Sequence, residues 1–156
     1  MKKNRNRSFF IKFVIIVVLL SLLTSCTDRG SAQDMLFNIT KEFDDLPDGS
    51  VYLSKNGSDS ENFLSATMIN TLYHDGAAEY EFSMIEEYAI YISEFAKPCE
   101  VAIYKCYSRS DTNLIASMCL GRIEKLTVML AGTSFAEIPL KADVDIKGHF
   151  VIVTMV

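Results

Sequence analysis

The sequence has none of the short motifs that identify most metalloproteins and nucleotide-binding enzymes. There is no C-x-x-C pair and no pair of histidines at ligand spacing, which argues against a metal site. A glycine-rich phosphate loop, a dinucleotide-binding fingerprint and a paired-carboxylate signature are all missing. The two histidines, His74 and His149, belong to no recognisable nucleophile arrangement. We therefore expect no cofactor and no metal, and a function other than catalysis.

Basic residues are scarce once the N-terminal segment is set aside. Cys26 to Val156 comprises 131 residues with ten basic and twenty acidic side chains. An acidic surface of this kind repels the phosphates of nucleic acids and anionic lipid headgroups, so neither is an expected partner.

At 156 residues, the whole chain has the length of a single domain.

The N-terminal segment carries the features of an export signal. Met1 to Ser25 contains five basic residues and no acid, and Phe13 to Leu23 is an almost wholly apolar run. That run is shorter than the roughly 20 residues that a membrane span needs. Leu23-Thr-Ser-Cys26 resembles the bacterial lipobox, in which the cysteine thiol takes a diacylglycerol and becomes the mature N-terminus. The alternative is an uncleaved anchor with an incidental cysteine; in both cases the remainder lies outside the cytoplasmic membrane.

On this basis the chain divides into three parts. Residues 1–25 are the expected lipoprotein signal peptide, residues 26–33 are the lipidated Cys26 with a flexible tether, and residues 34–156 are one α+β domain. Two acyl chains on one residue suffice for stable membrane attachment. We therefore expect the protein on the extracytoplasmic face of the cell membrane, anchored through diacylglycerol on Cys26.

The most patterned stretch of the domain is residues 87–107, in which EYAIY nearly recurs thirteen positions later as EVAIY. Both runs are rich in β-branched and aromatic residues, and Pro98 between them requires a turn, so we predict a central β-hairpin. Placing Ser93 opposite Glu100 gathers one apolar set on a single face, which we expect to lie under a following helix. The set comprises Ile90, Ile92, Val101 and Ile103.

Apolar residues spaced three or four apart predict amphipathic helices on both sides of the hairpin. The predicted helices span residues 33–45, 60–73 and 111–130. Further strand residues are expected at 51–53 and at 143–156, the latter with a turn or a bulge at Lys147-Gly148. The predicted fold is therefore α+β: a small, mostly antiparallel sheet, made of the 87–107 hairpin and the C-terminal strand, covered by two or three helices.

Two groups of side chains resemble sites but have plainer explanations. Cys99, Cys106 and Cys119 allow one disulfide to Cys119, yet three reduced and buried thiols are the preferred interpretation. A run of glutamates before the hairpin lacks the spacing of a cation-binding loop, so we interpret it as a solvated surface. The run comprises Glu79, Glu81, Glu86 and Glu87.

Glu100 and Arg122 are the best candidates for a specific polar contact. Glu100 opens the second strand of the hairpin, and Arg122 lies beside the apolar face of the helix expected at 111–130. When that helix folds onto the sheet, an unpaired guanidinium is costly to desolvate, so a carboxylate partner is expected. We predict a structural ion pair between them. The alternatives are a functional site at the same pair, and Glu86 or Glu87 as the partner of the arginine.

The C-terminal half resembles a known family of small lipoproteins from Gram-positive, mostly anaerobic bacteria. The similarity lies in Glu100-Val-Ala-Ile-Tyr104, in Arg122-Ile-Glu124 and in Lys147-Gly-His-Phe-Val151, and covers about Glu87 to Val153. This family is catalogued only as a domain of unknown function, family 4358. The resemblance implies a lipobox and an exported α+β domain, and it implies no known activity. It also implies a helix after the last strand, whereas this sequence stops at Val156, so one sheet face is expected to be less covered or to be covered by a partner.

Two classes of function follow from these observations. The first is a membrane-anchored extracytoplasmic lipoprotein that serves as a non-catalytic binding or assembly module, with an envelope protein as its partner. The second is a small cell-envelope hydrolase without a recognisable motif. The short mature chain favours the first, because solute-binding lipoproteins and hydrolases are usually larger.

Replacing Cys26 tests the anchor. Cys26→Ala removes the thiol that would carry the diacylglycerol, so we expect the protein to leave the membrane fraction or to accumulate unprocessed. Fractionation and intact-mass measurement check this, with Cys99→Ala as a matched cysteine control that should remain anchored. Membrane retention of a cleaved, correctly sized Cys26→Ala product would contradict lipidation at this residue.

Overall fold

The computed structural model describes residues 30–73, 78–94 and 97–156. The predicted signal peptide and Cys26 lie outside the described residues, as do residues 27–29 of the predicted tether. The residues from Ser31 onward belong to one folded unit.

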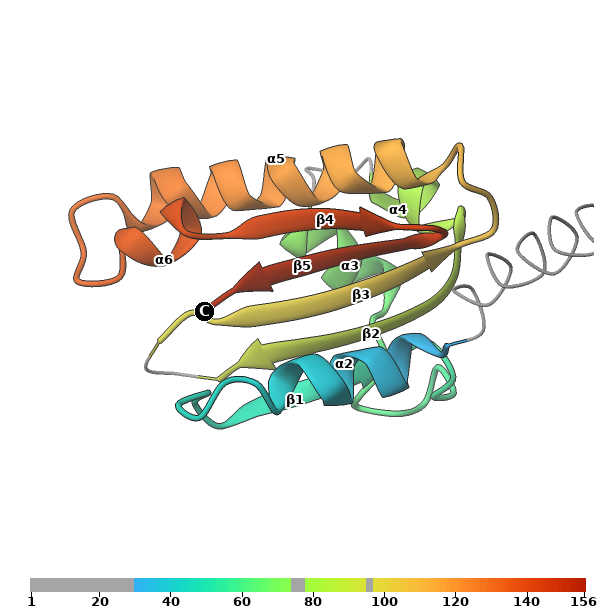
Figure 1. The fold of residues 1–156 in the computed structure, drawn as a ribbon, viewed down its shortest axis with the longest axis horizontal. Helices are drawn as coiled ribbons and strands as arrows, with labels where there is room; N and C mark the ends of the chain where they lie inside the picture. The colour runs from blue at the N-terminus through green and yellow to red at the C-terminus, as the bar shows by residue number, and fades with distance from the viewer. Residues whose placement is uncertain (1–29, 74–77, 95–96) are drawn as a thin grey trace, which may run out of the picture. The chain divides into compact units, whose positions relative to one another are not determined.

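A five-stranded antiparallel sheet forms the centre of this unit, in the order β1-β2-β3-β5-β4 (Figure 1). The predicted hairpin supplies β2 and β3, and the C-terminal residues supply the β4–β5 pair. The strands are β1 (Gly49–Leu53), β2 (Ile85–Ser93), β3 (Glu100–Cys106), β4 (Asp143–Lys147) and β5 (Phe150–Met155). The predicted α+β class is therefore confirmed, with a sheet that is antiparallel throughout.

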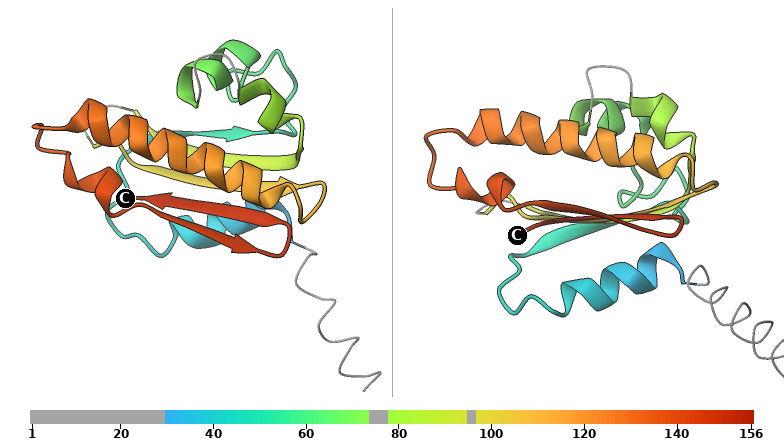
Figure 2. Two further views of the ribbon diagram at one scale, coloured as in Figure 1. Left: turned by 90° about the horizontal axis from the view of Figure 1, so that it is seen from above. Right: turned by 45° about the horizontal axis from the view of Figure 1, so that its top comes forward.

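Helices cover both faces of the sheet. On one face lie α5 (Thr112–Leu130), α3 (Ala66–Leu72) and α4 (Ala78–Phe82), and on the opposite face lies α2 (Ala32–Thr40) (Figure 2). A four-residue helix, α6 (Glu137–Leu140), precedes β4. Each face of the sheet thus carries at least one helix, and α2 is the described helix on the second face.

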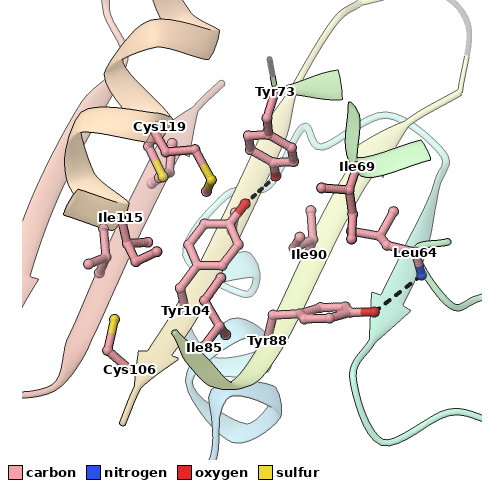
Figure 3. Close-up of a cluster of buried hydrophobic side chains, with 14 residues drawn as sticks. Leu64, Ile69, Tyr73, Ile85, Tyr88, Ile90, Tyr104, Cys106, Ile115 and Cys119 are labelled. Carbon is pink, nitrogen blue, oxygen red and sulfur yellow. Dashed lines mark hydrogen bonds between the residues drawn. The ribbon is translucent and has the colours of Figure 1, made fainter. Parts of the chain in front are cut away.

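Each face of the sheet buries its own hydrophobic cluster. The cluster beneath α5, shown in Figure 3, comprises Leu64, Ile69, Tyr73, Ile85, Tyr88, Ile90, Ala102, Tyr104, Cys106, Ile115, Met118, Cys119, Val151 and Val153. The cluster beneath α2 comprises Ala32, Leu36, Ala89, Tyr91, Cys99, Val101, Ile103, Phe150 and Ile152. The sheet is therefore the middle layer of three, and its central strands are apolar on both sides, as strands buried on two faces must be.

The register of the central hairpin differs by one residue from the predicted register. Ile92, and not Ser93, lies opposite Glu100. The reason is the turn, where Ser93 pairs with Cys99: the Ser93 N–H donates to Cys99 O at 3.0 Å, and the Cys99 N–H donates to Ser93 Oγ at 2.9 Å. The Ser93 side chain thus closes the loop, and the strand pairing begins one residue earlier than predicted.

This shift moves half of the predicted core set to the other face of the sheet. Ile90 and Ile92 pack in the cluster beneath α5, as predicted, whereas Val101 and Ile103 pack beneath α2. That part of the prediction is wrong. Because both faces of the hairpin are apolar, the hydrophobic pattern alone does not distinguish the two registers.

The predicted helix boundaries agree with the structure for α5 and differ elsewhere. α2 begins at Ala32, within the stretch predicted as tether, because the Ser31 hydroxyl oxygen accepts from the Asp34 N–H at 3.0 Å and caps the helix. α2 ends at Thr40 rather than at residue 45. α3 is also shorter than predicted, since Ser65 caps it and it begins only at Ala66. α4 and α6, of five and four residues, are too short to show helical periodicity in the sequence.

Two glycines are required by local geometry. Gly148 opens the two-residue turn between β4 and β5 with φ of 63°, a left-handed conformation that other residues rarely adopt. In β1, a Cβ at Gly49 would lie 2.6 Å from the Tyr91 ring and 2.5 Å from Ile92 O. The Tyr91 ring therefore packs across β1 only because position 49 has no side chain.

Truncating a residue beneath α2 tests the second cluster. Ile103 is fully buried between β2 and β5. Ile103→Ala should therefore lower the free energy of unfolding by about 2–5 kcal/mol, measured by chemical denaturation. Ile146→Ala is the matched control on edge strand β4, where the side chain is 40 % exposed. A loss below about 1 kcal/mol is expected for the control, and an equally small loss for Ile103→Ala would mean that α2 does not cover a packed core.

Candidate functional site

A buried ion pair joins the sheet to α5. Glu100 is the first residue of β3 and Arg122 lies in the middle of α5. The Arg122 Nε donates to Glu100 Oε2 at 2.6 Å, and Nη2 lies 2.6 Å from the same oxygen. The Glu100 side chain is 4 % exposed and the Arg122 side chain is 11 % exposed. The structure thus brings together the two residues predicted to pair, at a site almost wholly removed from water.

Arg122 also connects α5 to α3. Its Nη1 donates to the carbonyl oxygen of Leu72, the last residue of α3, at 2.8 Å. The guanidinium carbon lies 5.3 Å from the centroid of the Tyr73 ring, within range of a cation–π contact. One guanidinium therefore contacts β3, α3 and the residue that follows α3. Arginine suits this position because its several N–H groups point in fixed directions.

Two tyrosine hydroxyls meet beside the ion pair. Tyr73 and Tyr104 are hydrogen-bonded through their hydroxyl groups, and their rings pack edge to face at 6.3 Å between centroids (Figure 3). Burial raises the pKa of both phenols well above the ordinary value, and the Glu100 carboxylate adds to the rise. Both phenols therefore stay neutral at physiological pH, where each serves as a hydrogen-bonding group and not as a base.

Burial and charge also determine the state of the groups around the tyrosines. Burial lowers the pKa of Arg122, but the charge and hydrogen bond of Glu100, together with Tyr73 and Tyr104, raise it overall, so the guanidinium remains charged. Burial raises the pKa of the Cys119 thiol well above its usual range, and Glu100 raises it further. A neutral thiol is a poor nucleophile, so Cys119 lacks the activated form that catalysis needs.

The cluster has no room for a substrate. The cavity next to the ion pair measures about 10 Å³, which is space for one water at most. Its walls are Glu100, Cys119, Arg122, Ile123, Leu126, Val153 and Met155. We therefore assign the pair a structural role, in which it fixes α5 on the sheet and α3 against α5.

The other cysteines are buried and free as well. Cys99 and Cys106 are 1 % and 0 % exposed, and neither forms a disulfide with Cys119. Burial raises the pKa of the Cys106 thiol to about 11. The preferred interpretation of three reduced thiols agrees with these positions, and each thiol packs as a small apolar group.

The larger concavities lie at the end of the sheet where β2 turns into β3. One, of about 770 Å³, is lined by Lys97, Thr133, Ser134, Phe135, Ala136, Glu137, Ile138, Lys141 and Val156. A second, of about 340 Å³, is lined by Glu42, Phe43, Asp44, Asp45, Leu46, Lys97 and Val156. They share Lys97 and Val156, and we call them together the Lys97 trough. Its described walls carry ammonium, carboxylate, hydroxyl and apolar groups, which can form hydrogen bonds, ion pairs and apolar contacts with a bound molecule.

An apolar crevice lies between α2 and the edge strand β1. It measures about 330 Å³ and is lined by Gln33, Leu36, Phe37, Thr40, Leu46, Val51 and Tyr91. Phe37 and Val51 are 59 % and 38 % exposed, unlike the residues beneath them. We call this the α2 crevice. Sequence periodicity did not identify it, because it depends on the distance between a helix and a strand rather than on a pattern within either.

The remaining predicted site residues are placed as follows. Cys26 and His74 lie outside the described residues. Glu86 forms an exposed ion pair with Lys105 at 3.1 Å, so the alternative in which it holds Arg122 is wrong. His149 lies in the β4–β5 turn with Nδ1 3.3 Å from Cys106 O.

The described residues contain neither a group of side chains suited to a metal ion nor a helix suited to cross a membrane. In residues 30–73, 78–94 and 97–156, no three or more His, Cys, Asp or Glu side chains gather in a way that would hold a metal ion. No helix in the same part of the chain combines the length and the apolar composition needed to cross a membrane.

Comparison with known proteins adds no assignment: no family model, no curated protein and no solved structure matches this chain. The resemblance to family 4358 therefore stays a prediction.

A double-mutant cycle measures the buried pair. Arg122→Met leaves Glu100 buried without its partner and should lower the free energy of unfolding by about 3–5 kcal/mol. Glu100→Gln should also destabilise the fold, and the double variant should lose less than the sum of the two, with a coupling of about 1–3 kcal/mol. Chemical denaturation of the four proteins gives the coupling directly.

The exposed pair Glu86–Lys105 is the matched control, since it also joins neighbouring elements of the sheet region. Glu86→Gln and Lys105→Met should each cost no more than about 1 kcal/mol, with little coupling, because solvent screens this pair. Coupling near zero between Glu100→Gln and Arg122→Met would contradict a structural ion pair.

Proposed function

We propose that the protein is a non-catalytic binding or assembly module, held on the extracytoplasmic face of the cell membrane by lipidated Cys26 and directed at an envelope protein. The anchor rests on the lipobox-like Leu23-Thr-Ser-Cys26 and on the short apolar run before it. The binding role rests on the described domain.

The observation that carries the binding role is the position of the chemically reactive side chains. Glu100, Arg122, Tyr73, Tyr104 and Cys119 are buried and contact one another in a cluster beside a cavity of about 10 Å³. The cavities of 770, 340 and 330 Å³ that open at the surface are lined instead by apolar, hydroxyl and lysine side chains with some carboxylates. An active site needs reactive groups and access at the same place, and the buried cluster of Glu100, Arg122, Tyr73, Tyr104 and Cys119 lacks that access.

Exposed apolar side chains give further support. Several large ones are more than half exposed: Phe37, Tyr80, Tyr107, Leu120, Val128, Met129 and Leu140. Aromatic and methionine side chains of this kind are enriched where proteins contact one another. The alternative of a cell-envelope hydrolase has no comparable observation in its favour.

Cross-linking in intact membranes tests the proposal. The full-length lipidated protein is cross-linked in its own cell envelope, purified under denaturing conditions and analysed by mass spectrometry. The control protein carries residues 1–33 of this chain on an unrelated domain of similar size, so that anchoring and location are matched. We expect one envelope protein in near-stoichiometric amount with the native domain and none with the control.

Two results would contradict the proposal. One is the same set of cross-linked proteins for the native domain and the control, because proximity at the membrane alone would then explain them. The other is hydrolysis of an envelope polymer by the purified full-length protein, which would establish the enzymatic alternative.

A further inference from the structure

The two edges of the sheet are protected to very different degrees. β4, at one edge, has the sequence Asp-Val-Asp-Ile-Lys, and three charges in five residues discourage pairing with another strand. β1, at the other edge, reads Gly-Ser-Val-Tyr-Leu and has no charge, no proline and no bulge in its pairing with β2. Exposed edges without such protection accept additional strands.

The hydrogen bonds show which backbone groups of β1 face outward. Asp48 O accepts from the Glu94 N–H, and the Ser54 N–H donates to Tyr88 O, so the even-numbered residues bond to β2. In an antiparallel pair the alternate residues direct their N–H and C=O groups to the other side. Gly49, Val51 and Leu53 therefore present their backbone to the free edge.

Part of this edge is already used by the chain itself. The Leu53 N–H donates to Asn62 O, and Leu53 O accepts from the Asn56 N–H, so the loop after β1 occupies that end. The outward groups of Gly49 and Val51 have no hydrogen-bond partner among the residues that the structure describes. A short, open segment of edge remains, centred on Val51.

The α2 crevice lies beside the same residue. Val51 is paired with Tyr91, whose ring belongs to the cluster beneath α2, so the Val51 side chain points to that face and lines the crevice with Phe37. A residue paired with Val51 on an added strand would point to the same face, with its Cβ about 4.5–5.5 Å from that of Val51. The backbone of β1 and the crevice of about 330 Å³ are thus placed to bind one extended segment together.

Charge defines one end of such a segment. Asp48 immediately precedes β1, and Glu94 Oε1 accepts from the Ser50 hydroxyl of β1 at 2.7 Å; both acids are exposed. The two nearby lysines are engaged elsewhere. Lys41, directly after α2, has its Nζ 3.8 Å from the centroid of the Phe37 ring. Lys55, beyond the other end of β1, donates from Nζ to Gln33 Oε1. The carboxylates at the start of β1 favour a basic residue on the partner there.

We propose that β1 binds an extended, basic segment of another protein by strand addition, with an apolar side chain of that segment in the α2 crevice and a lysine or arginine near Asp48 and Glu94. This rests on the proposed function and names the class of partner it requires. Backbone hydrogen bonds to Val51 supply affinity, and the crevice and the carboxylates supply selectivity, as in other cases of strand addition.

A designed peptide tests the proposal on the full-length lipidated protein in detergent micelles. The probe is the acetylated, amidated peptide Thr-Lys-Val-Thr-Val-Lys-Thr, which places both valines on one face of an extended strand and both lysines on the other, the face on which Ser50 bonds Glu94. We expect saturable binding by isothermal titration calorimetry, and slower hydrogen exchange at the Val51 amide when the peptide is bound. The same peptide with glutamate in place of both lysines should bind more weakly.

Val51→Pro is the decisive variant. The Val51 N–H points to the free edge, so proline removes a donor to the added strand without removing a bond to β2, and prolines are tolerated at such edge positions. Its affinity for the probe should fall about tenfold or more, because strand addition depends on these bonds. Val51→Thr keeps the donor and the β-branched shape and should bind like wild type. If Val51→Pro does not fold, Val51→Lys takes its place. Its positive charge lies on the side of the α2 crevice, where an apolar side chain of the peptide would bind, so its affinity for the probe should also fall.

Three results would overturn the proposal. The first is undiminished binding to Val51→Pro or Val51→Lys. The second is an absence of saturable binding to wild type, or no protection of the Val51 amide. The third is protection of that amide without peptide in a dimer of the protein, which would identify a second copy as the occupant. If Val51→Pro still captures the wild-type envelope partner on cross-linking, strand addition is wrong while the proposed binding function stands.

Discussion

The fold depends on neutralising one buried positive charge. α5 covers the sheet only if Arg122 enters the interior with it, and an unpaired guanidinium there would cost several kcal/mol. Glu100 supplies the opposite charge from β3, and Leu72 O supplies a second acceptor from α3. This requirement couples three elements that are far apart in sequence. It sets the position of α5 along β3, and it holds α3 beside α5 with the Tyr73 ring against the guanidinium.

The elements that the sequence predicted correctly carry local signals, whereas the register of the hairpin depends on contacts between residues that are distant in sequence. α5 is predicted correctly and the β4–β5 turn to within one residue, at Gly148-His149 rather than Lys147-Gly148, because a nineteen-residue helix and a glycine turn carry strong local signals. The hairpin register carries no such signal, since both its faces are apolar. Glu100 nevertheless indicates which face of β3 lies under α5. Because its side chain must reach Arg122, the alternation of side chains along a strand places Ala102 and Tyr104 under α5 as well. Combining the long-range pair with strand parity gives the face of β3 that lies under α5, whereas the register against β2 also depends on the Ser93–Cys99 contacts of the turn.

The candidate binding surfaces were beyond prediction for a different reason. The α2 crevice and the Lys97 trough form where a helix, a strand and several loops end near one another, and their shapes follow from distances that no local pattern encodes. The hydroxyl contact between Tyr73 and Tyr104 is likewise a meeting of residues thirty-one positions apart. The domain therefore buries its most closely connected polar side chains and carries its larger concavities at the surface.

α2 has a mechanical consequence. It is nine residues long, it is the first described element of the folded unit, and among the described helices it is the one that covers the second cluster. Tension applied to the chain before Ser31 would therefore act on α2 first. A short helix held by a few apolar side chains can peel away one turn at a time, at lower force than is needed to shear the β-strands behind it. Pulling there would uncover Val101, Ile103 and Phe150 while the rest of the sheet and α5 stayed folded.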